Sequence, residues 1–414
     1  MTLLADKAVL LAKVETTFRT DASPSASTDA LLIGNPEYNL DVTQLSRDIV
    51  REDFSPLATS AGRKVASLTF THEVRNNGNT TGTSAPRVGV LLRGCGFAQT
   101  QITGASGTIG NASADAGNTG TVSFAKTTAF AGIVPRTVTI ECTQAGGTGT
   151  AQVSITAPAV GEVPAYSATG VTLTNATPVN LPNSAQVTPT ISASLDVGDI
   201  WTIELTPSGY EYTPISSAFE SLTLYLYRDG LLHKLTGARG NVSMQATGGQ
   251  YAQFTFTFTG DYVAITDAAL PSATYETQKP VQVELANLTI DDFDDFAAAE
   301  FTFDQQNDVQ IREDVNSENA YAGALIVGRA PTIGFNPEAV LEATHPVWAR
   351  LAAGTEMAFR AKIGTTKGNV VRFVSPNVQY TNVQYGDRNS ILTYDITLNC
   401  ARVSGNDEVK IAFN

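Results

Sequence analysis

The three histidines come first as candidates for catalysis, because imidazole acts as a general acid, a general base or a zinc ligand near neutral pH. His72, His233 and His345 lie far apart in the sequence, and none has the spacing of a His-Glu-x-x-His zinc site. The chain also lacks a Gly-x-Ser-x-Gly nucleophile turn and a Gly-x4-Gly-Lys-Ser/Thr phosphate loop. We therefore predict no enzyme and no cofactor, although a triad assembled from distant residues stays open.

One acidic cluster has the residue type that binds calcium, because hard cations prefer carboxylate oxygens. It consists of Asp291, Asp292, Asp294 and Asp295 around Phe293. The cluster lacks the fixed ligand spacing and the glycine of a calcium-binding loop. We predict a solvated acidic turn and no metal site.

The net charge argues against a protein that binds nucleic acid or membrane tightly, and the cysteine content argues against disulfide bonds and a zinc site. The 414 residues carry a net charge of −14, so the surface as a whole repels nucleic acid and anionic membrane. Such a chain does not grip DNA, whereas a channel past which DNA must slide would favour this sign. The chain has three cysteines, Cys95, Cys142 and Cys400, an odd number without Cys-x-x-Cys spacing. This pattern predicts buried free thiols.

The sequence shows neither the apolar run of a membrane-spanning helix nor the pattern of a secretory signal. No apolar run approaches the roughly 20 residues of a spanning helix. The first 13 residues are interrupted by Asp6, Lys7 and Lys13, unlike a secretory signal. We expect synthesis and folding in a cytoplasm, with no membrane partner.

Alternation of polar and apolar residues predicts a mainly β fold. Residues 65–74, 222–227 and 254–259 are rich in Thr, Val, Phe and Tyr with period two. In the last of these (FTFTFT) the phenylalanines must share one face and the threonines the other. Helices are few: residues 86–97 and 346–353 each begin with proline and carry an apolar stripe, which predicts two short helices packed on a sheet.

Composition changes between residues 103 and 209, where the only basic residues are Lys126 and Arg136. Short strands are expected at 121–124, 136–141 and 200–205, separated by glycine-rich and Pro-Asn turns. We interpret this segment as an inserted, Ig-like β-sandwich with Trp201 in its interior, rather than a long floppy loop.

Several short motifs occur twice. Residues 50–53 (VRED) return as 311–314 (IRED), and Gly62-Arg63 returns as Gly328-Arg329. The two helix candidates follow in both halves. Next, Lys234-Leu235, Gly248 and residues 254–259 match Arg372-Phe373, Gly386 and residues 392–397 at one constant offset. The order strand, helix, hairpin, amphipathic strand is thus written twice, which favours a structural duplication.

Four segments give the chain a resemblance to a known family. They are 213–225 (TPISSAFESLTLY), 228–240 (RDGLLHKLTGARG), 13–21 (KVETTFRTD) and 91–97 (LLRGCGF). Together they resemble the major tail tube proteins of Mu-like and related long-tailed bacteriophages. The resemblance covers most of the chain outside the insert up to about residue 265, and the C-terminal part matches less literally. Family members join the Cys95 region to the Thr213 region by a short link, so the insert is a departure.

The resemblance implies a fold of two tandem tail-tube-type β-sandwich or barrel domains with short helices, plus the inserted sandwich. We expect a first tube domain at residues 1–102 and 210–268, the insert at 103–209, and a second tube domain at 269–414. It also implies a structural virion protein whose rings stack into a hollow conduit that delivers DNA to the host.

Partners follow from the same resemblance. If a ring uses six tube domains, a chain with two of them forms a trimer with pseudo-sixfold symmetry; a hexamer is the alternative. The rings would meet tape-measure, tail terminator and tail-tip proteins, while phage DNA passes without specific binding. The location would be the virion tail, assembled in the host cytoplasm.

Two sets of residues are candidates for these roles. The candidate lumen-facing residues are Ser67, Thr69, Thr71, Glu73, Thr255, Thr257, Thr259, Thr393, Asp395 and Thr397. The same residues also fit the ordinary solvent face of an antiparallel sheet. The candidate inter-subunit loop residues are Arg51, Glu52, Asp53, Arg312, Glu313 and Asp314, which also fit exposed loop charge of little energetic value.

Two other classes of function stay open on sequence grounds. The chain, or its insert alone, could be a virion surface adhesion protein that binds carbohydrate or host surface, although the insert has few aromatic residues. A virion hydrolase that degrades surface polysaccharide would need a cleft with converging carboxylates.

Overall fold

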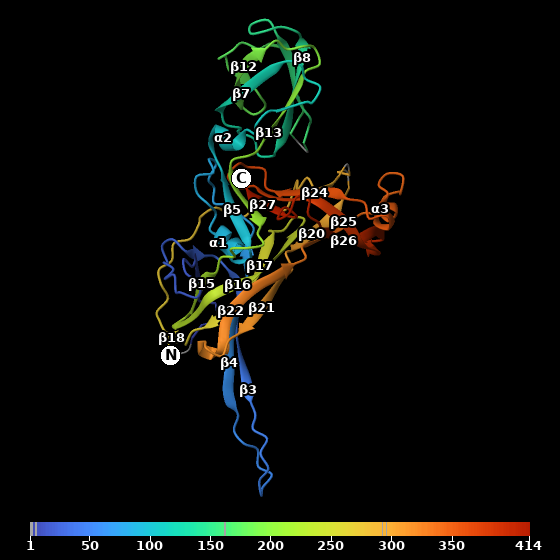
Figure 1. The fold of residues 1–414 in the computed structure, drawn as a ribbon. Helices are drawn as coiled ribbons and strands as arrows, with labels where there is room; N and C mark the ends of the chain where they lie inside the picture. Colours follow the sequence, from blue (N-terminus) through green and yellow to red (C-terminus); the bar gives the residue numbers. More distant parts are fainter. Residues whose placement is uncertain (1–2, 5, 161–162, 292, 295) are drawn as a thin grey trace.

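A computed structural model describes residues 3–4, 6–160, 163–291, 293–294 and 296–414. The fold is mainly β, with most strands gathered in one large antiparallel sheet (Figure 1). The strands of its first part are β1 (Ala8–Val14), β2 (Ala30–Leu31), β3 (Gly34–Leu45), β4 (Ser60–Glu73), β5 (Phe97–Ile102), β14 (Gly209–Pro214), β15 (Leu222–Arg228), β16 (Leu231–Thr247), β17 (Gln253–Tyr262) and β18 (Thr266–Asp267). Those of its second part are β19 (Thr289–Ile290), β20 (Ala298–Asp304), β23 (Thr332–Pro337), β24 (Met357–Ile363), β25 (Val371–Arg388), β26 (Ile391–Cys400) and β27 (Lys410–Phe413).

The centre of this sheet, which we call the central sheet, runs in the order β3, β4, β17, β16, β20, β23, β26, β25, with every pair antiparallel. Its first four strands come from residues 34–262 and its last four from residues 298–400, and we call these two parts the first and the second half. The halves join where β16 pairs with β20, with Met244 opposite Phe303 and Ala246 opposite Phe301. Over the described residues the sheet does not close on itself into a barrel.

One core serves both halves. Phe254, Phe256 and Phe258 of β17 are fully buried on one face, as their alternation with threonine predicts. Phe254 also lies 6.2 Å, ring to ring, from Phe373 of β25. Burial of an aromatic side chain of this size stabilises the fold by roughly 1.5–3 kcal/mol. The C-terminal strand β27 ties the halves again, because it pairs with both β14 and β25.

Within the described residues three α-helices accompany the sheets: α1 (Val88–Gly94), α2 (Gly104–Thr108) and α3 (Val347–Ala353). The predicted helices at 86–97 and 346–353 are confirmed as α1 and α3. Helix α1 is deeply buried because Gly94 lets it approach the sheet; a Cβ there would lie 2.5 Å from Leu222. No helix in the described ranges has the length and apolar character needed to traverse a lipid bilayer.

The insert has its own sheets and its own core. A five-stranded sheet has the order β10 (Tyr166–Thr172), β9 (Gln152–Ala157), β8 (Arg136–Gln144), β13 (Ile200–Leu205), β6 (Ser113–Ala114). A three-stranded sheet contains β11 (Val179–Asn180), β12 (Gln186–Ala193) and β7 (Thr121–Thr128). Buried side chains of both sheets form one cluster that includes Trp201, as expected. The exact domain boundaries remain a prediction.

Two hairpins project from the central sheet. The strands β3 and β4 extend into a long arm that leaves the body at the end opposite to the insert (Figure 1). The second hairpin, β21 (Asn307–Glu313) and β22 (Tyr321–Arg329), continues β20 and β23 and is closed by the 3₁₀ turn η1 (Glu318–Ala320). The 3₁₀ turn packs against β4.

The repeated motifs fall on corresponding elements, with one correction. Phe258 of β17 pairs with Gly240, and Ile396 of β26, its counterpart in the repeat, pairs with Val383. The constant offset therefore does not extend to β16 and β25. Arg372 does not occupy the position on β25 that corresponds to the position of Lys234 on β16. The reason is physical, since the β25–β26 turn is shorter than the β16–β17 turn. Both hairpins nevertheless carry an irregularity at the same level, beside Thr259 and Thr397.

Candidate assembly surfaces

The candidate lumen-facing residues lie on one polar face of the central sheet. Cross-strand pairs place Thr255 opposite Thr71 and Thr257 opposite Thr69, with a hydrogen bond of 3.2 Å between the last two hydroxyls. The same face continues through Ser243, Asp304 and Thr332 into the second half, where it carries Asp395 and Thr397. The structure thus brings all ten candidates onto one face, although Thr393 is only 4% exposed there.

The charge of this face is mainly negative. Its acidic side chains are Glu37, Asp41, Glu73, Glu300, Asp304 and Asp395. Basic side chains on it are held by the protein itself. Arg63 pairs with Asp41 and Glu313, and Arg388 pairs with Glu338. Arg239 donates to the carbonyls of Phe219, Glu220 and Ala324. A surface of threonines and carboxylates with restrained cations has little that would hold a phosphate backbone.

The two ends of the central sheet are open. Strand β3 pairs only with β4, and from Gln379 to Arg388 the strand β25 pairs only with β26, within the described part of the chain. Each edge therefore presents unpaired backbone N–H and C=O groups, which template pairing with another strand. On β3 the core-side residues Tyr38, Leu40 and Val42 are only half-buried.

An aromatic cluster with one exposed member, Tyr385, lies beside the open edge of β25. Trp348 of α3 is 5.2 Å from Tyr385, which in turn is 5.5 Å from Tyr394, measured between ring centroids. Tyr385 is 61% exposed, and Leu392 next to it is also exposed. Exposed apolar side chains next to an unpaired edge are the kind of surface through which proteins associate.

The predicted loop residues are divided between the two hairpin tips. Arg51, Glu52 and Asp53 lie in the loop of residues 46–59, which we call the long tip. Arg312 and Glu313 do not lie in a loop: they end strand β21, because the β alternation of the hairpin continues to Glu313. Asp314 begins the loop of residues 314–320, the short tip.

The repeated motif builds the same local turn in both tips. The carboxylate of Asp53 accepts a hydrogen bond from the N–H of Ser55 at 2.8 Å, and that of Asp314 accepts one from the N–H of Asn316 at 3.0 Å. Between them, Phe54 and Val315 are fully or almost fully exposed. Next to the short tip, Glu313 at the end of β21 forms an ion pair with Arg63 of β4 at 2.7 Å, and no ion pair of the described residues joins the long tip to another strand.

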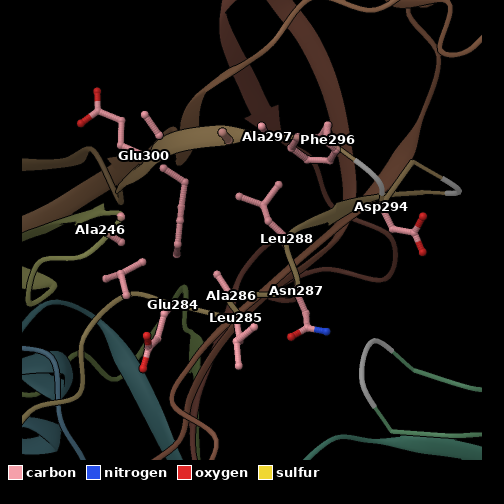
Figure 2. Close-up of a pocket in the computed structure, with 15 residues that line it drawn as sticks. Ala246, Glu284, Leu285, Ala286, Asn287, Leu288, Asp294, Phe296, Ala297 and Glu300 are labelled. Atoms are coloured by element: carbon pink, nitrogen blue, oxygen red, sulfur yellow. The ribbon is translucent and has the colours of Figure 1, made fainter.

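One hollow of the described residues lies between residues 283–288 and strand β20 and is lined mainly by apolar side chains. Leu288 points into it, while Asp294 and Glu300 direct their carboxylates away (Figure 2). Among the described residues no group of three or more His, Cys, Asp and Glu side chains is placed to hold a metal. In the acidic cluster Asp291 and Asp294 are exposed and Phe293 is buried, while Asp292 and Asp295 lie outside the described residues.

Histidines and cysteines are structural groups in the interior. His72 is buried on β4, and burial, followed by the charge of Arg75, lowers its pKa to about 4. Tyr38 on the β3 edge has its pKa raised to about 12, first by burial and then by Tyr262. All three cysteines are buried and free, which confirms the prediction.

Comparison with known protein families decides the identity. Residues 196–400 match the family model described as phage tail tube protein. The chain belongs to the phage tail tube protein family. A comparison with curated proteins finds no match.

The match to the tail tube family covers β13 to β26. It includes β16 and β17 of the first half of the central sheet and all four strands of the second half, whereas β3 and β4 lie outside it. Of the four resembling segments, 213–225 and 228–240 lie within it, and the match continues far into the C-terminal half. The family is structural, so this chain is a component of the virion tail and assembles with other tail proteins.

Sequence reasoning missed the strand that joins the halves of this tail tube protein. The signal was present, since Phe301-Thr302-Phe303 in β20 repeats the Phe-Thr-Phe pattern of β17. The cluster of Trp348, Tyr385 and Tyr394 was missed for another reason. Its members come from distant elements, and only the packing of α3 on β25 and β26 brings them together.

Proposed function

We infer that copies of this chain join edge to edge, β3 of one copy against β25 of the next, into a closed ring wall. This inference rests on the pairing of β16 with β20 inside the chain. In the order of the central sheet, β16 is the last strand of the first half and β20 is the first strand of the second half. Strands β25 and β3 are the corresponding last and first strands at the open ends of the sheet. Closure removes both unpaired edges, which favours a ring over an open sheet.

The ring contains three chains. The two halves share strand order and the same hairpin irregularity, so each half supplies one of six similar units. Symmetric closure is the ordinary outcome for homo-oligomers. A hexamer of whole chains is the alternative, and it would double the number of strands in the wall.

Stacked rings form the conduit through which phage DNA enters the host. The polar face of the central sheet, with Ser67, Thr69, Thr257 and Asp395, lines the lumen. Its threonines and carboxylates repel phosphate or contact it weakly, so DNA slides without being held. A tape-measure protein inside the growing tube, and terminator and tail-tip proteins at its ends, are the expected neighbours.

Electron microscopy and mass photometry of the purified protein test the ring. Hollow rings or tubes with three chains per ring are expected. Leu40→Lys should abolish rings, because it places a charge on the core side of the β3 edge. Val197→Lys, at an exposed position of the insert, is the matched control. Dispersed wild-type monomers would refute the assembly, and six chains per ring would refute the trimer.

The lumen assignment has its own test. Thr257→Lys and Asp395→Lys should retain DNA in assembled tails and lower infectivity without preventing tube formation. Thr143→Lys, on an exposed position of the insert, is the control. Normal plating of phage carrying the first two variants would argue against a lumenal position.

The insert decorates the outside of the tube. It interrupts the chain at one connection, between β5 and β14, and its core is separate from that of the central sheet. Deletion of residues 103–209 with a short linker should leave rings intact. Loss of rings in the deletion protein would instead make the insert part of an assembly contact.

A further inference from the structure

The short tip shows how one half of the chain rests on the other. Tyr321, which follows this tip, is 1% exposed because it packs beside Arg19, whose guanidinium lies 5.7 Å from the ring centroid. Burial, followed by the charge of Asp261, raises the pKa of the Tyr321 hydroxyl. Nearby, Glu313 reaches Arg63. An aromatic residue and a glutamate of the second half are thus seated on β4 and β17 of the first.

The corresponding place in the second half is an open hollow. Because β17 and β26 correspond, with Phe258 opposite Leu68 and Ile396 opposite Phe335, the strand register matches residues 62–65 of β4 with residues 329–332. This is one residue further along than the match of Gly62-Arg63 with Gly328-Arg329. Likewise Asp261 and Tyr262 match Asn399 and Cys400. Residues 329–331, Asn399 and Cys400 line a hollow of about 460 Å³ that also includes Arg402 and Asn406. We call it the Arg402 hollow.

We propose that the long tip of a second copy in the same ring occupies the Arg402 hollow, with Phe54 inserted and Glu52 facing Arg402. The proposal rests on the ring inferred above. In that ring β3 of the second copy lies beside β25 of the first copy, in the same way as β20 lies beside β16 within one chain. The hairpin that continues β3 is then carried over the second half just as the β21–β22 hairpin is carried over the first.

Burial and charge agree with this occupant. Phe54 is fully exposed in the single chain, and so is Val315, its counterpart in the repeat, but Phe54 is the much larger apolar side chain. Within the described residues Arg402 has no ion-pair partner, whereas Arg63 at the matching site is paired with Glu313. Arg329 is already used, because it is paired with Glu408 and bonded to the carbonyl of Ile215 at 2.5 Å. Arg402 is therefore the cation left for Glu52.

Truncation and charge exchange measure the contact. Phe54→Ala should raise the protein concentration needed for half-maximal ring formation about tenfold, because a seated aromatic anchor is lost. Val197→Ala, an exposed apolar residue of the insert, should leave it unchanged. Glu52→Arg should weaken ring formation several-fold, and Arg402→Glu in the same chain should restore it. No recovery in the double variant, together with no effect of Phe54→Ala, would overturn the proposal.

Disulfide cross-linking locates the contact. One batch of chains carries Ser55→Cys and another carries Val403→Cys, both at exposed positions, while the native cysteines are buried. Mixed rings should yield covalent dimers on oxidation, and a mixture of Ser55→Cys with Val197→Cys should not. Cross-links in isolated single rings support the proposal. Rings without cross-links, or cross-links that appear only after rings stack, overturn it and leave the ring itself standing. Failure of the wild-type chain to form rings refutes the ring instead.

Discussion

Strands β3 and β20 occupy the same position in the two halves, yet their core-side residues differ in burial. On β20, Phe301 and Phe303 are each 2% exposed because β16 covers them from one side and β23 from the other. On β3, Tyr38 and Leu40 are half-buried because only β4 lies beside them. The comparison teaches that the single chain contains one complete pairing between halves, β16 with β20, and two unpaired edges, β3 and β25. The complete joint is therefore a template for the contact between copies.

The largest expected effect contrasts these two strands directly. Phe303→Ala should lower the free energy of unfolding of the monomer by about 3–5 kcal/mol, because it leaves a cavity in the shared core. Leu40→Ala should cost the monomer only about 1 kcal/mol, since much of its side chain is already in water. Urea unfolding of both variants at a concentration below assembly checks this. Equal losses would mean that the β3 edge is as complete as the β20 joint.

The second effect contrasts two arginines that follow the repeated glycine. Arg329 and its partner Glu408 are both largely buried, so Glu408→Gln leaves a desolvated cation and should cost roughly 3 kcal/mol. Arg63 pairs with Glu313, whose side chain is 74% exposed, so Glu313→Gln should cost less than about 1 kcal/mol. Thermal unfolding measures both. A large loss from Glu313→Gln would show that the short tip is a structural clamp rather than a surface contact.

These contrasts also show what the sequence could reveal. The alternation of residues 254–259 predicts β17 and its buried face, and the proline starts predict α1 and α3, because these signals depend on neighbours in the chain. The pairing of β16 with β20 and of β27 with β14 depends on contacts between residues far apart, and no local pattern specifies it. The constant offset of the repeat failed for the same reason: a shorter turn in the second hairpin shifts one strand against the other.

The third effect depends on pH and comes from His72 in the first half. The pKa of His72 falls from 6.5 in the unfolded chain to about 4 in the fold, so between these values the unfolded chain binds a proton that the folded chain does not. Stability is therefore full above pH 6.5 and decreases as the pH falls, by about 1.4 kcal/mol per pH unit from this group. Strand β23, which corresponds to β4, has no histidine.

The variant His72→Leu isolates this pH effect. Urea unfolding at pH 7 and pH 5 should show a smaller loss of stability in the variant than in the wild-type chain. Hydrogen exchange at pH 5 should place the early loss in β4 and β17, which pair with each other, and not in β23 and β26. A loss of protection that begins in the second half would contradict the role of His72.

The smallest expected effect is on the polar face, where the two halves should behave alike. Thr257 and Asp395 occupy matching positions on β17 and β26, and both side chains are exposed. Replacement of either by lysine should change the free energy of unfolding of the monomer by less than about 0.5 kcal/mol, because no packing is lost. Calorimetry of the two variants would measure this. If one variant loses 2 kcal/mol or more, its half of the face is covered within the chain. The polar face would then be a surface of one half and not a continuous wall, and the symmetry inferred for the ring would fail at the lumen first.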